Sequence, residues 1–157
     1  MKTFYCKTVD YVANSRYHAA QAEPAFAFDH GLSYSTFHYE ALVVTQSLVS
    51  FQITNNGSRS AAEVAQLYLT YPATAGEPPH QLKAFEKTRV LNPGETTTVA
   101  LVLVPRAYSI WDAKAHAWAV VVGDFAVAVG SSSQDTRLRT QLRSQSRSQL
   151  LRGFNTR

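Results

Sequence analysis

Short runs of alternating apolar and polar residues, separated by turn-forming residues, recur along this chain from residue 36 onward. The clearest run extends from Glu63 to Tyr71, where every second residue, including Ala65 and Leu67, points to the same side of an extended chain. A period of two predicts β-strands with one face turned toward a core. Because no ten-residue stretch carries a competing helical stripe, we expect no helical layer.

We expect seven strands, over residues 36–45, 47–54, 63–71, 81–91, 96–104, 117–122 and 124–129. Turn residues separate them: 55–58 after the second, a proline-rich loop over 72–79 after the third, and 92–95 before the fifth. Asn and Gly tolerate the positive φ that tight reversals need, so we expect tight turns at Asn55–Ser58 and Asn92–Glu95. The last two strands should be joined at Gly123. The predicted fold class is all-β: a fibronectin type III-like or immunoglobulin-like antiparallel β-sandwich of about seven strands.

The chain divides into three parts by composition. Residues 1–35 are rich in Tyr, Ala, His and Pro without clear periodicity, which predicts an extended N-terminal arm or linker. The sandwich is expected over 36–138. Residues 139–157 hold five arginines and no acid, which predicts a basic, disordered tail. The tail lacks the interleaved aromatic residues that stack on bases, so we expect no nucleic-acid partner.

Few residues are available for metal or cofactor chemistry. Cys6 is the one cysteine, which excludes an intramolecular disulfide framework and a cysteine-based zinc site. The five histidines lack metal-ligand spacing; they are His18, His30, His38, His80 and His116. We therefore predict no metal site and no cofactor. Lys7 and Asp10 interrupt any apolar leader and the longest apolar stretch is far too short to span a bilayer, so we expect no targeting segment and no membrane anchor. The compartment is not indicated.

Several blocks of the sequence agree, in order and spacing, with one known family. They are PAFAFDHGLSYSTF at 24–37, AAEVAQLY at 61–68, QLKAFEK at 81–87, LNPGE at 91–95, Trp111-Asp112, Trp118, Gly123-Asp124-Phe125 and VGSSS at 129–133. Together they resemble the C-terminal fibronectin type III-like domain of glycoside hydrolase family 3 enzymes, chiefly β-glucosidases, over about residues 11–138. Asp29 and Ala84 stand where that family usually has Gly, so we expect backbone strain or rebuilding, above all at Ala84.

The resemblance implies a non-catalytic role. In the family, a preceding barrel supplies the carboxylate nucleophile and an α/β layer usually supplies the acid, and this chain contains neither. We therefore predict no catalytic residue here, and the sequence names no substrate-binding residue. The predicted function is an accessory module that stabilises or packs against the catalytic domains of a glycoside hydrolase parent.

Three groups of residues could suggest a site, and each has a simpler interpretation. We expect Trp111 to pack in the core and Asp112 to cap a turn. Glu86 and Lys87 are adjacent and therefore lie on opposite faces of a strand, which favours surface solvation or an ion pair. Ser131–Ser133 lacks a nucleophile elbow, so we interpret it as a polar loop at a strand end.

A second function remains open from the sequence. Exposed aromatic residues such as Tyr68, Tyr71 or Tyr108 could make the chain a stand-alone module that binds polysaccharide, lignin or a protein partner. The non-catalytic interpretation requires an interior filled by side chains. A deep pocket lined by opposed Asp and Glu side chains would contradict it.

Overall fold

The computed structural model describes residues 30–144 apart from Pro79. Within these residues the chain forms nine strands: β1 (Phe37–Val44), β2 (Leu48–Asn55), β3 (Val64–Thr70), β4 (Gln81–Lys87), β5 (Thr96–Val102), β6 (Ser109–Asp112), β7 (Ala117–Val120), β8 (Gly123–Gly130) and β9 (Thr136–Ser144). Two short 3-10 helices, η1 (Ala73–Ala75) and η2 (Pro105–Tyr108), join strands. The all-β prediction is confirmed. No helix among the described residues has the length and apolar character needed to cross a membrane.

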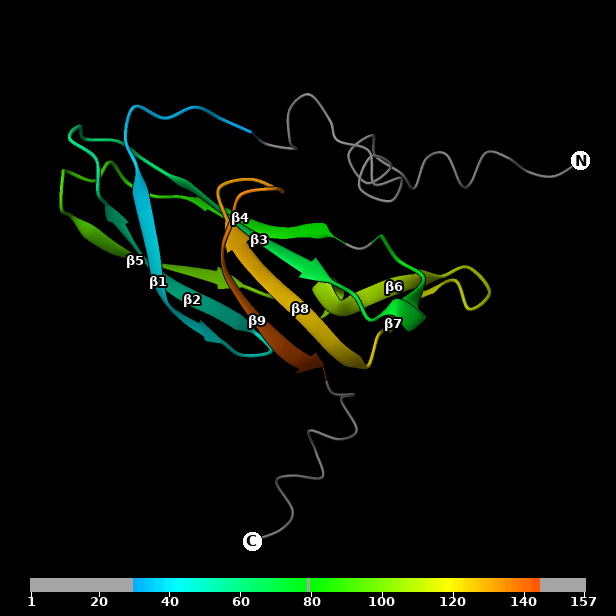
Figure 1. Cartoon of the computed structure of the whole chain (residues 1–157). Helices are drawn as coiled ribbons and strands as arrows, with labels where there is room; N and C mark the ends of the chain where they lie inside the picture. The colour runs from blue at the N-terminus through cyan, green and yellow to red at the C-terminus, as the bar shows by residue number, and fades with distance from the viewer. Residues whose placement is uncertain (1–29, 79, 145–157) are drawn as a thin grey trace, which may run out of the picture.

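The strands make two layers and a separate hairpin (Figure 1). One sheet has the order β1-β2-β5 and the other β4-β3-β8-β9, while β6 and β7 pair only with each other. Every ladder is antiparallel. Because the chain changes sheet between β2 and β3, between β4 and β5, and again before β8, the architecture is a sandwich rather than a meander.

Alternation along the strands decides which side chains fill the space between the sheets. Phe51 in β2 is 1% exposed, and Leu67 in β3 and Phe125 in β8 are fully buried. Tyr71 packs edge-on against Phe125 with ring centroids 4.9 Å apart. Burying an apolar side chain of this size stabilises the fold by about 1.5–3 kcal/mol, so these facing layers supply the main driving force for folding.

Two strands were not predicted. β6 is only four residues long, and β9 begins two residues before the predicted end of the sandwich and continues to Ser144. The predicted boundary at 138 is therefore wrong, because residues 139–144 pair with β8 in the same sheet. Residues 1–29 of the arm predicted over 1–35, and residues 145–157 of the predicted tail, lie outside the described residues.

Two predicted connections also differ. The strands predicted over 117–122 and 124–129 do not meet at Gly123: β7 ends at Val120 and pairs with β6, and Gly123 is the first residue of β8, which pairs with β3 and β9. Gly123 has φ +149°, and a Cβ there would lie 2.9 Å from the Pro72 ring, so the position suits only glycine. β4 ends at Lys87, and Leu91, which was expected in this strand, instead bridges to Ala61.

The two predicted tight turns have different outcomes. At Asn92–Glu95 the Glu95 N–H donates to the Asn92 carbonyl at 2.9 Å, and Gly94 has φ +77°, which confirms the turn. At Asn55–Ser58 the predicted positive φ is wrong for Gly57. Gly57 is needed for space instead, because a Cβ would lie 2.0 Å from Ser35 Oγ.

The predicted strain at Ala84 is not found in its φ angle. Ala84 pairs with Leu67, but Tyr68 pairs with Leu82, so Lys83 is an extra residue in the ladder. This irregularity is a β-bulge, and Ala84 has no positive φ. Asp29, the other departure from the family's glycines, lies outside the described residues.

Candidate functional site

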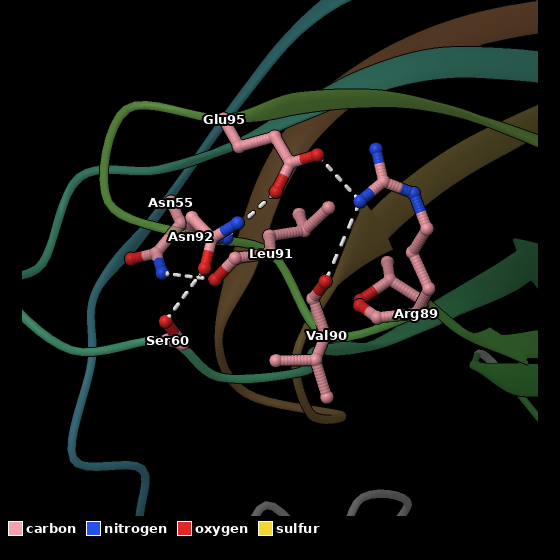
Figure 2. A network of polar contacts seen from close by, with 8 residues as sticks. Asn55, Ser60, Arg89, Val90, Leu91, Asn92 and Glu95 are labelled. Carbon is pink, nitrogen blue, oxygen red and sulfur yellow. Dashed lines mark hydrogen bonds and ion pairs between the residues drawn. The ribbon is translucent and has the colours of Figure 1, made fainter.

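A buried amide, Asn55, organises one end of the sandwich (Figure 2). Its side chain is fully buried. Nδ2 donates to the carbonyl oxygens of Leu91 and Arg59, each at 2.8 Å. Oδ1 accepts from Ser35 Oγ at 2.6 Å and from the Gly57 N–H at 2.9 Å. The amide therefore joins its own turn to two distant segments, at Ser35 and Leu91, and leaves none of its main hydrogen-bonding positions unused.

The turn at 91–95 extends this network to the surface. Figure 2 shows Glu95 between Asn92 and Arg89: the Asn92 N–H lies 2.8 Å from Oε2, and Arg89 Nη1 lies 2.5 Å from Oε1. The Asn92 hydrogen bond and then Arg89 lower the pKa of the Glu95 carboxyl. Ser60 Oγ donates to Asn92 Oδ1 at 2.9 Å. These polar groups are occupied in holding the turn, so the network is a structural clamp.

A cavity of about 430 Å³ lies between residues 30–36 and strands β1, β3 and β9, and it holds the acids Glu63 and Asp135. Glu63 is 9% exposed, and the Tyr39 hydroxyl donates to its Oε1 at 2.9 Å. Burial raises the pKa of the Glu63 carboxyl, while the Tyr39 hydrogen bond and Arg137 act in the opposite direction. Burial also raises the pKa of the Tyr39 hydroxyl, so both groups hold their protons more strongly than they would in water.

The pKa of the Asp135 carboxyl is shifted in the opposite direction from that of Glu63. Arg137 contacts both of its oxygens, with Nε 2.6 Å from Oδ1 and Nη2 2.7 Å from Oδ2, and Ser131 Oγ donates to Oδ2 at 2.7 Å. The hydrogen bond from Arg137 is the main reason that the pKa of Asp135 is lowered.

Glu63 and Asp135 line the same cavity, so they can be compared with the acid pair of a glycosidase. Glycosidases combine a carboxylic acid of raised pKa with a second, ionised carboxylate that attacks or activates water. Here Glu63 meets the first condition. Asp135 does not meet the second, because Arg137 and Ser131 already occupy its oxygens and reduce its ability to attack. The geometry therefore favours a structural role over catalysis for this cluster of Tyr39, Glu63, Asp135 and Arg137, which we call the clasp around Glu63.

The β6–β7 hairpin presents the chain's two tryptophans at the surface. Trp111 and Trp118 are partners across the hairpin, 50% and 47% exposed, and their rings meet edge to face at 5.5 Å. The Arg106 guanidinium lies over the Trp118 ring at 4.1 Å. The prediction that Trp111 packs in the core is wrong, because the hairpin stands apart from the two sheets. Asp112 caps the turn as predicted, accepting from the N–H groups of Lys114 and Ala115.

The tyrosines predicted to be exposed are buried. Tyr68, Tyr71 and Tyr108 are 2%, 6% and 5% exposed. Tyr68 lies on the outer face of its sheet, but His80 stacks on its ring at 4.4 Å. Burial raises the pKa of Tyr71 and of Tyr108 to about 12. The prediction that these three tyrosines form an exposed binding surface is therefore wrong.

The remaining sequence candidates stay apart. Glu86 and Lys87 are both exposed on β4. The serine run forms the turn before β9, where Ser132 Oγ accepts from the Asp135 N–H at 3.0 Å, as expected of a polar loop. Across residues 30–144 no three His, Cys, Asp or Glu side chains gather in a way that could hold a metal ion.

Comparison with known proteins agrees with this architecture. A family model for the fibronectin type III-like domain matches residues 63–133, from the start of β3 to the turn after β8. The chain carries a fibronectin type III-like domain. Strands β3 to β8 lie within this matched region, as does Leu91, whose carbonyl accepts from Asn55.

The relatives of this fibronectin type III-like chain are β-glucosidases. The β-glucosidase cel3A of Pyricularia oryzae is 37% identical over 150 residues, which cover 85% of this chain and 19% of that protein. The probable β-glucosidase D of Aspergillus oryzae is 37% identical over 139 residues, covering 73% of this chain and 18% of that protein. The chain spans about a fifth of the length of these relatives.

Solved structures give the same result. The β-D-glucoside glucohydrolase of Trichoderma reesei has a TM-score of 0.77 and 34% identity, covering 82% of this chain and 21% of that chain. The β-glucosidase 3B of Thermotoga neapolitana, solved with α-D-glucose, has a TM-score of 0.75 and 37% identity, covering 82% and 18%. The predicted resemblance to the fibronectin type III-like domain of glycoside hydrolase family 3 is confirmed.

Sequence reasoning missed the clasp around Glu63. Tyr39, Glu63 and Arg137 are far apart in the sequence, and only the fold brings them to one cavity. One signal was available, since the alternation of β3 places Glu63 on the same side as the buried Ala65 and Leu67. An acid on the inward side of a strand indicates a buried carboxyl that needs partners.

Proposed function

We propose that this chain is a non-catalytic accessory module of a glycoside hydrolase family 3 β-glucosidase and that it packs against the part of the enzyme that carries the catalytic residues. One observation carries the proposal: the chain matches only about a fifth of its relatives, and that fifth is a closed sandwich. The facing layers fill the interior, and of the two acids in the cavity described above, Asp135 is held by Arg137 and Ser131 and Glu63 by Tyr39.

Exposed apolar side chains support the packing role. Within the described residues, exposed large apolar residues occur on the segment before β1, on β4, at the end of β5 and on the β6–β7 hairpin. A domain that packs on a neighbour would bury such groups.

Hydrolysis by the purified chain is the direct test. We expect no turnover of a chromogenic β-glucoside, with the full-length Pyricularia oryzae relative as positive control. A Glu63→Gln variant is the matched control, because it keeps the hydrogen-bond acceptor for Tyr39 but removes the acid. Turnover by the wild-type chain that is lost in Glu63→Gln would identify the cavity as a catalytic site and end the proposal.

A second candidate is adhesion to polysaccharide or lignin through Trp111 and Trp118, and their exposure at a projecting hairpin favours it. Flat aromatic faces pack against the apolar faces of sugars and against other rings. A pull-down with insoluble glucan and with lignin tests it. Retention that is lost in a Trp111→Ala/Trp118→Ala variant supports adhesion, and no retention at low salt removes it.

A further inference from the structure

Leu32 and Tyr34 are the large apolar side chains with the greatest exposure among the described residues, at 95% and 92%. Phe85 follows at 68%. At 95% and 92% exposure, Leu32 and Tyr34 bury almost none of their surface against the sandwich. Single exposed apolar residues are ordinary on protein surfaces, but two so close together on one short segment are a concentrated apolar feature.

This segment is held firmly where it meets the sandwich. Ser35 is 8% exposed, and its Oγ donates to Asn55 Oδ1 at 2.6 Å and to the Arg59 carbonyl at 3.0 Å. One residue later, the Thr36 carbonyl accepts from the Asn56 N–H at 2.8 Å. The missing Cβ of Gly57 allows this close approach. The position of the segment is therefore fixed by the sandwich, although Leu32 and Tyr34 do not pack on it.

The surroundings explain why these side chains are not covered internally. Residues 30–33 line the cavity that also contains Glu63, Asp135 and Arg137, so charged side chains lie beside this segment. An apolar side chain gains nothing by turning toward such groups, which would lose their hydration. Within residues 30–144, no apolar surface covers Leu32 or Tyr34.

The relatives indicate where a covering surface would come from. In the solved Trichoderma reesei and Thermotoga neapolitana enzymes the matching region is 21% and 18% of one longer chain, so most of each protein remains to pack against it. We propose that Leu32 and Tyr34 are the docking anchors through which this domain binds the remainder of a β-glucosidase chain. The hydrogen bond between Ser35 and Asn55 holds the segment that carries them. The inference rests on the proposed function.

The occupant is defined by its chemistry. It must present an apolar surface that accepts a leucine side chain and a tyrosine ring, with a hydrogen-bond acceptor for the Tyr34 hydroxyl, since buried tyrosine hydroxyls usually find a partner. Exposed apolar residues also occur on the outer face of the three-stranded sheet and on the β6–β7 hairpin, but these two surfaces are less suited to docking. On the outer face of the three-stranded sheet, Val43 lies beside the polar Ser50, and on the hairpin Arg106 already covers Trp118.

The test uses the full 157-residue chain and the Pyricularia oryzae β-glucosidase from which the 150-residue matching region has been removed. Binding is measured by titration calorimetry for the wild-type chain, for Leu32→Ser/Tyr34→Ser, and for Val43→Ser/Val102→Ser. The last variant is matched, because Val43 and Val102 are 60% and 65% exposed on another face. If the shortened relative does not fold, the same variants are placed in the full-length relative with its matching region exchanged for this chain, and susceptibility to limited proteolysis replaces affinity.

We expect Leu32→Ser/Tyr34→Ser to weaken binding, or to accelerate proteolysis, by about tenfold to a hundredfold, because each apolar side chain lost from an interface contributes about tenfold. The matched variant should stay within about twofold of wild type, the scale of ordinary surface substitutions. The melting temperature of the isolated chain should not change with either substitution at 32 or 34. Wild-type docking that survives Leu32→Ser/Tyr34→Ser unchanged overturns the anchors while leaving the proposed function intact. Absence of wild-type docking in both arrangements overturns the proposed function itself, and the anchors with it.

Discussion

Two neighbouring asparagines have opposite importance for stability. Asn55 is fully buried with four hydrogen bonds, whereas the Asn56 side chain is exposed. We expect Asn55→Ala to lower the free energy of unfolding by about 2–4 kcal/mol, because it removes four hydrogen bonds at a fully buried position and leaves the Gly57 N–H without its acceptor. Asn56→Ala should change it by no more than about 0.5 kcal/mol. Urea unfolding of both variants measures the difference, and equal effects would contradict the clamp.

Glu63 gives a second prediction, in its pH dependence. Because burial raises the pKa of its carboxyl in the folded chain, the folded state holds the proton at pH values where the unfolded state has released it. This contribution to stability is present below the ordinary carboxyl pKa and is lost as the pH rises through the folded-state pKa. Each unit of difference corresponds to about 1.4 kcal/mol.

The comparison with Glu63→Gln isolates this contribution, since other acids such as Asp135 have lowered pKa values and act in the opposite sense. Relative to the wild type, Glu63→Gln should become progressively more stable between about pH 4.5 and neutral pH, the upper side of the ordinary carboxyl range. Urea unfolding at several pH values measures the gap. A gap that stays constant across this range would show that Glu63 does not retain its proton in the folded state.

These residues also show how far sequence reasoning reaches. Alternation correctly predicted a strand at β3 with two distinct faces, but it could not separate Asn55 from Asn56, because both suit a turn. The difference arises from contacts with Ser35 and Leu91, which are distant in sequence. Tyr68 illustrates the same limit: it lies on an outward face, and only the fold places His80 over its ring.

At the level of elements, β9 is the strand whose composition concealed it. Its inward positions include Leu138 and Leu142, which pack partly against the core, while Arg137, Arg139 and Arg143 are exposed. The alternation was therefore present, but a run of arginines without acids also fits a disordered tail. Edge strands commonly carry charge in this way because it discourages pairing with other chains. The short β6 gave no such pattern, since four residues are too few for a period to show.

The position of the true boundary can be tested by truncation. A chain that ends at Leu138 loses the ladder between residues 139–144 and β8, together with the packing of Leu142. We expect it to be less stable by about 2 kcal/mol than a chain that ends at Ser144, from the lost ladder and the partly buried Leu142 together. Thermal unfolding followed by circular dichroism measures this loss.

Removal of charge is the control for that truncation. An Arg139→Ala/Arg143→Ala variant of the longer chain should melt close to its parent, because the Arg143–Asp124 pair is long, at 3.9 Å, and exposed. If the chains that end at Leu138 and at Ser144 are equally stable, residues 139–144 belong to the tail and not to the sandwich.

At the scale of the whole molecule, the outer face of the three-stranded sheet is divided. The row formed by His38, Thr54 and Thr96 is polar, whereas Leu48 and Val102 pair farther along the same sheet and are exposed. Toward that second end lies the β6–β7 hairpin, and Figure 1 shows it beyond the edge of both layers. The sandwich thus has one end closed by the Asn55 network and another end whose hairpin is joined to the core by few contacts.

This asymmetry predicts that the molecule does not unfold as a single unit. β6 and β7 pair only with each other, and all four residues of β7 are exposed, so the hairpin lacks the third strand that usually makes such a unit stable. Both tryptophans of the chain lie on it, so tryptophan fluorescence reports on the hairpin, whereas far-UV circular dichroism reports mainly on the two sheets. During urea unfolding we expect the fluorescence midpoint to precede the dichroism midpoint, because local opening requires less free energy than global unfolding. Coincident curves would mean that Ile110 and the Val121–Tyr108 hydrogen bond suffice to hold the hairpin within the cooperative core.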